Sequence, residues 1–497
     1  MVSKSKRVLA LLLTGLMATA FLTACDDGGA GTSTPAGTQT SGTATGDAKE
    51  IFSDEMTKML KDKIAEEAAS KGKKDEKTGK QTISLRMWCS GDDLAFETAL
   101  VEQFKELYKD DRYDIKVVLN GANGEDKAAT KVLEAPEKAA DVFSFSDDQL
   151  RNLVQADAIA KVSPLFNSNV IKENSAESVS VCSVDGTAYA FPRTADNGYF
   201  MYYDKRVFTD PKDLETFDGM VTKANAAGKQ VLMAVTNAWY NSGFFFTAGV
   251  TIGYNGKTQT GTFNTPEGLK GAKAIAHLCE SADKGFKGSG DDSAVVSGFD
   301  NGSLAAAVTG TWNGKAIRSK IGAENLGACK LPTILMDGEQ KQLCSFGGYK
   351  ILGVKASTDY IVTAQTLAYF LTCPESQLKR YNGLYDAAGT FVKGEDGEIL
   401  ARGFVPTATN EAIEAVKTKS AGEVQKRIDE AVSGLAIDES AQAIEAQRPF
   451  SQPQSGAGGK YWTPVGAIGD EILNAKGKLT DKELEEKLQK VVDGFAS

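Results

Sequence analysis

Strand-like and helix-like segments alternate along this chain from residue 82 onward, and that order restricts the possible folds more than any other feature. Residues 82–88 alternate as a half-buried strand does, and residues 94–108 repeat apolar side chains at the spacing of an amphipathic helix. Strand patterns return at 113–119 and 141–145, and a helical pattern follows at 147–157. A strand–helix–strand order favours a largely parallel sheet with helices on its faces. The sequence therefore predicts the α/β fold class.

The body of the chain is too long for a single hydrophobic core. It has more than 400 residues, so we expect two lobes. Ligands of open α/β sheets bind beyond the carboxyl ends of the strands. At those places the sequence has Asp92 and Asp93, then Asp148, then Arg193 and Asp196. Arg193 either pairs with Asp196 or reaches the ligand, and the pattern does not choose between these roles.

The N-terminal segment has the pattern of a bacterial lipoprotein signal. Three positive charges precede an apolar run over 8–22, and small residues then lead to Cys25. The run is shorter than the roughly 20 apolar residues of a permanent membrane span. We expect removal of residues 1–24, lipid on Cys25, and a mature protein anchored to the outer face of the bacterial cell membrane. The alternative is an uncleaved anchor helix with a chance cysteine.

A tether and a helix are expected between Cys25 and the body. Residues 28–46 are almost all Gly, Thr, Ser and Ala, which is typical of a flexible linker. Residues 54–70 place Met56, Leu60 and Ile64 on one helical face. This helix either forms a stalk or docks on the body, and we assign the whole of 25–80 to the lipidated tether.

Charge and histidine content exclude several classes of function. The formal net charge is −10, and loss of the three positive charges in residues 1–24 makes it −13. An acidic body argues against nucleic acid as a partner. The single histidine, His277, lies in a helical pattern and is expected to pack there. Triads that need histidine and multi-histidine metal sites are therefore excluded, and the sequence predicts neither a cofactor nor a metal.

Two cysteines flank a predicted hairpin. Asp337-Gly338 marks its tip, with Cys329 before it and Cys344 after it. These cysteines are either bridged across the strands or buried as free thiols.

Four blocks of sequence follow one another in a specific order. They are LRMWCSGDD…FKELY (85–108), ADVFSFSDDQL…IAKV (140–162), GTAYAFPRTADN…KRVF (186–208) and FDNGSLAAAVTGTWNGKA…LPTI (299–334). A C-terminal segment has Tyr461-Trp462 and a capping box of Thr480 and Glu483. Together these segments resemble the extracellular solute-binding proteins of ABC importers, family 1, of the maltose and maltodextrin-binding type. The resemblance covers about residues 82–497.

The resemblance implies a two-lobed, type II periplasmic-binding-protein-like fold with the ligand between the lobes. By analogy the chain crosses between lobes near 193–196, 331–333 and 402–406. One lobe would hold 81–194 plus 332–402, and the other 195–331 plus 403–497.

The resemblance also implies the ligand-binding residues. Sugar hydroxyls bind carboxylates, and sugar C–H faces stack on aromatic rings. Asp93 stands where the family commonly has lysine, which is a departure from the pattern. The residues that match positions of sugar contact, or lie beside them, are Asp92, Phe145, Asp148, Asp196, Trp239, Tyr240, Trp312 and Trp462.

Structural roles compete with these assignments. Tryptophan is most often a core residue, although Trp312 and Trp462 stand beside small or turn residues outside any apolar stripe. Trp88, inside the first strand pattern, is expected to pack in the core. Asp148 could instead cap the helix that follows it.

The function that follows is binding without catalysis. The partners would be an oligosaccharide, expected to be a malto-oligosaccharide, the transmembrane permease subunits of an ABC importer, and the membrane through lipid on Cys25; we expect a monomer. The alternatives are a binder of another oligosaccharide, an extracellular glycoside hydrolase, and an adhesin or chaperone-like lipoprotein with a peptide groove.

Overall fold

The computed structural model describes residues 53–496, apart from 126, 196, 256–257, 396, 420–421, 423, 428–448 and 452–459. The predicted signal segment 1–24, the lipidation site Cys25, the linker 28–46 and the predicted ligand residue Asp196 lie outside the described residues. Among the helices that are described, none has the length and apolar character needed to cross a membrane.

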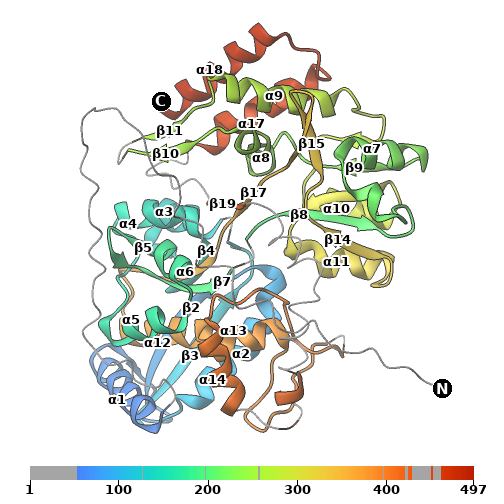
Figure 1. Ribbon diagram of the computed structural model, residues 1–497. Helices are drawn as coiled ribbons and strands as arrows, with labels where there is room; N and C mark the ends of the chain where they lie inside the picture. Colours follow the sequence, from blue (N-terminus) through green and yellow to red (C-terminus); the bar gives the residue numbers. More distant parts are fainter. Residues whose placement is uncertain are drawn as a thin grey trace, which may run out of the picture. The chain divides into compact units, whose positions relative to one another are not determined.

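A mixed sheet organises the first half of the fold (Figure 1). β2 runs parallel to both β3 and β4, as the alternating pattern predicts, whereas β18 is antiparallel to β4 and β7. The strands of this sheet are β1 (Lys73–Lys74), β2 (Gln81–Trp88), β3 (Tyr113–Asn120), β4 (Val142–Ser146), β7 (Ala190–Thr194) and β18 (Lys350–Val354).

Helices cover this first sheet and bury their apolar faces on it. In α2, Phe96, Leu100 and Phe104 are at most 2% exposed, which is the face that the helical spacing predicts. The helices and 3-10 turns of this half are α1 (Asp54–Lys71), η1 (Gly91–Asp93), α2 (Leu94–Leu107), α3 (Ala128–Glu134), η2 (Pro136–Lys138), η3 (Asp147–Gln149), α4 (Leu150–Gln155), α5 (Pro164–Glu173), α6 (Ala176–Val181), α12 (Ile361–Thr372), α13 (Pro374–Asn382) and α14 (Asn410–Lys419). A short hairpin, β5 (Ser183–Val184) and β6 (Thr187–Ala188), precedes β7.

The helix α1 docks on the body rather than standing away from it as a stalk. Met56, Leu60 and Ile64 are buried in the same core as α2 and α12, and α1 lies beside α12 in Figure 1. The Glu67 carboxylate accepts the backbone N–H groups of Val362 and Thr363 at 2.8 and 2.9 Å. These are unpaired donors in the first turn of α12, so Glu67 satisfies groups that the helix itself cannot.

A second mixed sheet organises the other half. Its order is β12-β9-β13-β8-β14, with β9 parallel to β12 and β13, and β8 antiparallel to its two neighbours. Its strands are β8 (Phe200–Asp204), β9 (Gln230–Leu232), β12 (Phe286–Lys287), β13 (Leu304–Thr309) and β14 (Leu326–Cys329). Its helices and 3-10 turn are η4 (Pro211–Leu214), α7 (Phe217–Ala226), α8 (Ala238–Ala248), α9 (Pro266–Cys279), α10 (Asp292–Asp300), α11 (Thr311–Ile321), α17 (Trp462–Asn474) and α18 (Asp481–Ala496). The hairpin of β10 (Ile252–Tyr254) and β11 (Gln259–Gly261) follows α8.

The predicted capping box opens α18. The Thr480 backbone N–H donates to Glu483 Oε2 at 2.8 Å, and the Glu483 N–H donates to Thr480 Oγ1 at 3.3 Å. This reciprocal pair satisfies two donors at the start of the helix.

The predicted lobe crossings stay predictions, and hydrogen bonds show where two of the segments concerned lie. We expected the second crossing near 331–333. The hairpin of β15 (Thr333–Met336) and β16 (Glu339–Gln342) stays with the second half, where Thr333 N–H donates to Glu215 O. The chain joins the first sheet only at β18. Tertiary hydrogen bonds decide this placement, and they leave no mark on local sequence.

The residues after 402–406, the third predicted crossing, are hydrogen-bonded to the first half. After residue 406 the chain remains with the first half, because Gln377 Oε1 accepts from Thr407 N–H at 2.7 Å and Arg427 Nε donates to Asn382 O at 2.8 Å. The next described strand, β19 (Pro449–Ser451), pairs in parallel with β17 (Ser345–Gly347). The lobe boundaries stay predictions.

The predicted hairpin is present, but its cysteines are not bridged. Asp337 and Gly338 have φ values of 52° and 80°, as a tight hairpin turn requires. Among the six described cysteines, no disulfide joins Cys329 to Cys344 or to any of the others.

Candidate ligand-binding site

Two buried aspartates follow β4. Asp147 and Asp148 are 3% and 4% exposed. Tyr349 N–H donates to Asp147 Oδ1 at 2.9 Å, which fixes this turn to the loop before β18. Burial raises the pKa of each carboxyl to about 7. Both groups therefore change charge near neutral pH.

Asp148 is joined to an aromatic side chain from the far end of the sequence. Its Oδ2 accepts from Trp462 Nε1 at 3.3 Å and from Gln149 Nε2 at 2.7 Å. No side-chain capping bond opens the helix after it, so the capping role is not observed. The structure thus brings together two of the predicted ligand residues.

Trp462 belongs to an aromatic cluster at the starts of α8 and α17. Trp239 stacks on Phe346 with ring centroids 5.1 Å apart and planes 22° apart. Trp462 lies 6.0 Å from Trp239 and 5.6 Å from Phe346. The Asn237 side chain accepts Trp239 N–H at 2.9 Å and so fixes the start of α8. Both indoles are only partly buried.

Tyr240 connects this cluster to the strand β13. It is 9% exposed, and its ring meets the edge of Tyr199 at 5.1 Å. Burial raises the pKa of Tyr240 above its usual range, while a hydrogen bond with Thr309 opposes the shift. With so little exposed surface, Tyr240 supports the aromatic cluster more than it offers a free face.

Trp312 is held at the start of α11 by a hydrogen-bond network. Its Nε1 donates to Asp292 Oδ1 at 3.0 Å. Asn313 Nδ2 donates to the same oxygen at 2.8 Å and to Thr309 Oγ1 at 2.9 Å. A Cβ at Gly310 would lie 2.0 Å from the indole, so only glycine lets the ring rest there. Thr309 therefore links Trp312 to Tyr240, and half-buried Trp312 keeps an accessible face.

Phe145 is a correction to the predicted site. It is 0% exposed, packs 5.4 Å from Phe143, and is so tightly covered that a Cβ at Gly353 would lie 2.8 Å from its ring. A ring without accessible surface has no stacking face, so Phe145 is a core residue in this structure. Asp92 is exposed in η1, where it is free to meet a ligand. Trp88 packs partly buried against the same core as Phe145, as predicted.

Arg193 lies in a buried ion-pair network, whereas Asp196, its predicted partner, lies outside the described residues. Its guanidinium is 1% exposed and forms ion pairs with Asp93, Glu97 and Glu125 at 2.7, 2.8 and 2.7 Å. Arg402 Nε donates to the other oxygen of Asp93 at 2.6 Å.

Asp93 therefore holds two distant segments of the chain together. Burial alone raises the pKa of Asp93, but Arg193 and Arg402 outweigh it and hold the pKa well below its usual range. At the position where the family commonly has lysine, this chain therefore has Asp93, which forms structural ion pairs. Glu97 also pairs with Arg380 at 2.8 Å, which extends the buried charge network to α13.

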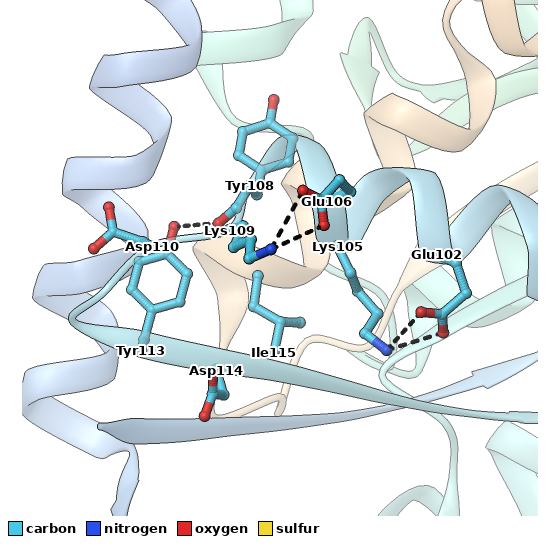
Figure 2. A pocket seen from close by; sticks show the side chains of 9 residues that line it. All are labelled: Glu102, Lys105, Glu106, Tyr108, Lys109, Asp110, Tyr113, Asp114 and Ile115. Atoms are coloured by element: carbon cyan, nitrogen blue, oxygen red, sulfur yellow. Dashed lines mark hydrogen bonds and ion pairs between the residues drawn. The ribbon is translucent and has the colours of Figure 1, made fainter. Parts of the chain in front are cut away.

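A surface hollow lies at the opposite end of the first sheet (Figure 2). It lies between the last turns of α2 and the start of β3 and is lined by Glu102, Lys105, Glu106, Tyr108, Lys109, Asp110, Tyr113, Asp114 and Ile115. Lys105 pairs with Glu102 and Lys109 with Glu106. Its charges are paired and it is remote from the carboxyl ends of the strands, so we assign no ligand to it.

The geometry defines a class of binding protein. Carboxylate and aromatic side chains from segments far apart in sequence meet beside two mixed α/β sheets, and among the described residues no group of metal-ligating side chains accompanies them. The chain belongs to the bacterial extracellular solute-binding protein family, whose model matches residues 99–393, more than half of its length. No curated protein matches it.

Solved structures show the same two-lobed fold. One, described as a complex with acarbose, is 28% identical with a TM-score of 0.66, over 84% of this chain and 99% of that chain. A maltodextrin-binding protein from L. casei BL23 is 23% identical with a TM-score of 0.61, over 84% and 99%. The maltose–maltodextrin binding protein of Alicyclobacillus acidocaldarius is 17% identical with a TM-score of 0.61, over 84% and 100%. The predicted family and fold are confirmed.

Proposed function

We propose that this protein binds a malto-oligosaccharide outside the cytoplasm and delivers it to the permease of an ABC importer. The observation that carries the proposal is the contact between Trp462 and Asp148, beside the ring of Trp239. A carboxylate that accepts a hydroxyl proton and flat indole faces that cover C–H groups are the two things a sugar needs from a protein. The similar structures described with maltodextrin, maltose or acarbose support the same ligand class.

The proposed ligand residues are those that keep a usable surface or polar atom. Asp148, Trp239, Trp312 and Trp462 form the centre of the proposed site, and Tyr240 supports it. Asp92 and Asp196 remain proposed contacts from the family pattern. Three indoles suit an oligomer better than a monosaccharide.

The proposed mechanism is a shift between open and closed arrangements of the lobes. A ligand that touches residues from both halves favours the closed arrangement by its difference in affinity for the two. The permease then recognises the closed arrangement of the lobes. No step of covalent chemistry is involved, and the protein acts as a monomer.

Lipid on Cys25 would keep the binding protein close to the permease. The lipobox pattern before Cys25 and the linker after it support this placement, and tethering raises the effective concentration of one partner near the other. Replacing Cys25 by alanine in the native bacterium should release the protein from the membrane fraction. Retention of Cys25→Ala in the membrane would contradict lipid anchoring and favour an uncleaved helix.

The binding proposal is tested by thermal melting and tryptophan emission with maltose through maltohexaose. At least one of these sugars should raise the melting temperature and change the emission. If none of these sugars changes the melting temperature or the emission, the assignment of a malto-oligosaccharide ligand is wrong. Release of reducing sugar from the same oligosaccharides would show hydrolysis instead, and stabilisation by peptides but not sugars would favour a peptide groove.

A further inference from the structure

Lys350 is a buried lysine whose ammonium group has no hydrogen-bonding partner among the residues that the structure describes. It is the first residue of β18 and is 6% exposed. Among the described residues, no hydrogen bond and no ion pair reaches its Nζ, whose close contact is the Phe404 ring, 4.3 Å to the centroid. Lys355, at the other end of the same strand and 7% exposed, instead donates to Ala139 O at 3.2 Å and pairs with Asp141. A buried ammonium is costly without partners, so the spare donors of Lys350 need an explanation.

The position of Lys350 is fixed on the ligand side of the sheet. It pairs in register with Ser146 on β4 and with Thr194 on β7, at the carboxyl ends of both strands. The preceding residue, Tyr349, is hydrogen-bonded to Asp147, next to Asp148. Phe404 lies beneath the ammonium and also meets the Arg402 guanidinium at 4.9 Å, which restrains both cations.

Unused acceptors lie near the same place. Thr194 Oγ1 is buried and accepts no hydrogen bond from any described residue. Glu125 receives Arg193 Nη1 at 2.7 Å and Ser144 Oγ at 3.0 Å, both on Oε1. A carboxylate has about four lone-pair positions, so Glu125 retains accepting capacity. Burial raises the pKa of Glu125, but Lys350 and Arg193 outweigh it and hold it below its usual value, so the acceptor is ionised at neutral pH.

We infer that Lys350 and Glu125 form a further ligand subsite that takes one sugar hydroxyl, with Lys350 donating to its oxygen and Glu125 accepting its proton. A neutral hydroxyl fits better than an anion because the carboxylate of Glu125 already opposes the lysine charge. The subsite extends the ligand contacts from Asp148 toward β7 and the Arg402 segment. This inference rests on the proposed function, since it names an additional contact for the same ligand.

The test compares Lys350→Met with wild type and with Lys355→Met. Methionine keeps the length of the lysine stem and removes the ammonium. Affinity for maltose through maltohexaose is measured by calorimetry, and melting temperature without ligand checks that each variant folds. Lys350→Met should weaken the best ligand about tenfold or more, because the lost hydrogen bond involves a charged donor. Lys355→Met should leave the affinity unchanged.

Reductive methylation of wild type gives a second measurement that does not depend on a variant folding. The ligand should slow methylation of Lys350 and leave Lys355 unchanged. Wild type that binds sugar while Lys350→Met binds equally well, or while Lys350 reacts at the same rate with and without ligand, overturns the subsite alone. Wild type that binds none of the sugars overturns the proposed function and the subsite with it.

Discussion

Trp462 and Asp148 lie 314 residues apart in sequence, yet the indole Nε1 of one donates to the carboxylate of the other across 3.3 Å. The pair joins the start of α17 to the end of β4, and so connects the helices of the second half to the first sheet. A sugar hydroxyl could form a hydrogen bond with either atom and so replace the bond between Trp462 and Asp148. This relationship is the basis of the predictions that follow.

Truncating Trp462 should weaken sugar binding strongly. We expect Trp462→Ala to reduce affinity for the best malto-oligosaccharide by about tenfold or more, because loss of a central aromatic contact commonly costs about 2 kcal/mol. Trp88→Phe, which changes a partly buried indole in the first half, should leave affinity close to wild type. Calorimetric titration of both variants checks this, and affinity of Trp462→Ala within twofold of wild type would remove Trp462 from the site.

Asp292 should act on binding through Trp312. Its carboxylate accepts from both Trp312 Nε1 and Asn313 Nδ2, so Asp292→Ala frees the indole without removing it. We expect Trp312→Ala to weaken binding about tenfold or more, and Asp292→Ala to weaken it less. Together the two changes should weaken binding no more than Trp312→Ala alone. Additive losses in this double-mutant cycle would show that Asp292 acts independently of Trp312.

The buried pair Asp147 and Asp148 should make stability depend on pH. In the folded protein their pKa values are about 7, whereas an exposed aspartate titrates near 3.9. Between these values the folded protein holds protons that the unfolded chain has released. The free energy of unfolding should therefore fall as pH rises from about 4 to about 7, and this contribution should level off above that.

Asparagine at both positions removes this proton difference. The variant Asp147→Asn/Asp148→Asn should lose stability less steeply than wild type across the same pH range, as measured by denaturant unfolding at closely spaced pH values. Equal slopes in the two proteins would mean that neither carboxyl is held protonated by the fold.

Removing Arg193 should destabilise the protein by about 3–5 kcal/mol, because Asp93, Glu97 and Glu125 would each lose one buried cationic partner. Arg193→Met keeps much of the side-chain volume. Lys105→Met provides the comparison, since Lys105 and Glu102 form a solvent-exposed pair for which we expect a change below about 1 kcal/mol. Urea unfolding of both variants measures the difference, and similar small losses would contradict a role for the buried network in stability.

The docked position of α1 makes its apolar face part of the core. Ile64→Ala should cost about 2–5 kcal/mol, as other large-to-small core changes do. Glu67→Gln should also destabilise, through loss of a charged acceptor at the start of α12, whereas Glu66→Gln at an exposed position should not. Unchanged melting of Ile64→Ala would mean that the helix stands away from the body.

The spacing of apolar residues predicted helices and strands well where burial of one face determines the structure. Strand alternation at 82–88 and apolar spacing at 94–108 reappear as β2 and α2, because burial of one face determines both. The segments around the predicted crossings at 331–333 and 402–406 are held by hydrogen bonds of Thr333 and Thr407 to distant residues. Such contacts have no signature within a window of sequence.

The sequence predicted which residues lie at the candidate site better than it predicted what each of them does there. The family pattern predicted Asp148, Trp239 and Trp462 as ligand residues, and Trp462 contacts the other two in the structure. Their contacts with sugar stay predictions. Phe145 was proposed from the family pattern, but it lies in a strand whose residues are buried on both faces and its ring is part of the core. Lys350 could not be found from sequence, because it stands out only by its lack of a hydrogen-bonding partner among the described residues.

The most direct test of the central claim is calorimetric titration of the purified wild-type protein with maltose through maltohexaose. The account predicts saturable binding of at least one of them with one site per chain, a negative heat-capacity change from the buried aromatic surface, and a parallel change in tryptophan emission. Absence of binding heat at several temperatures, together with unchanged emission for every sugar in the series, would contradict it.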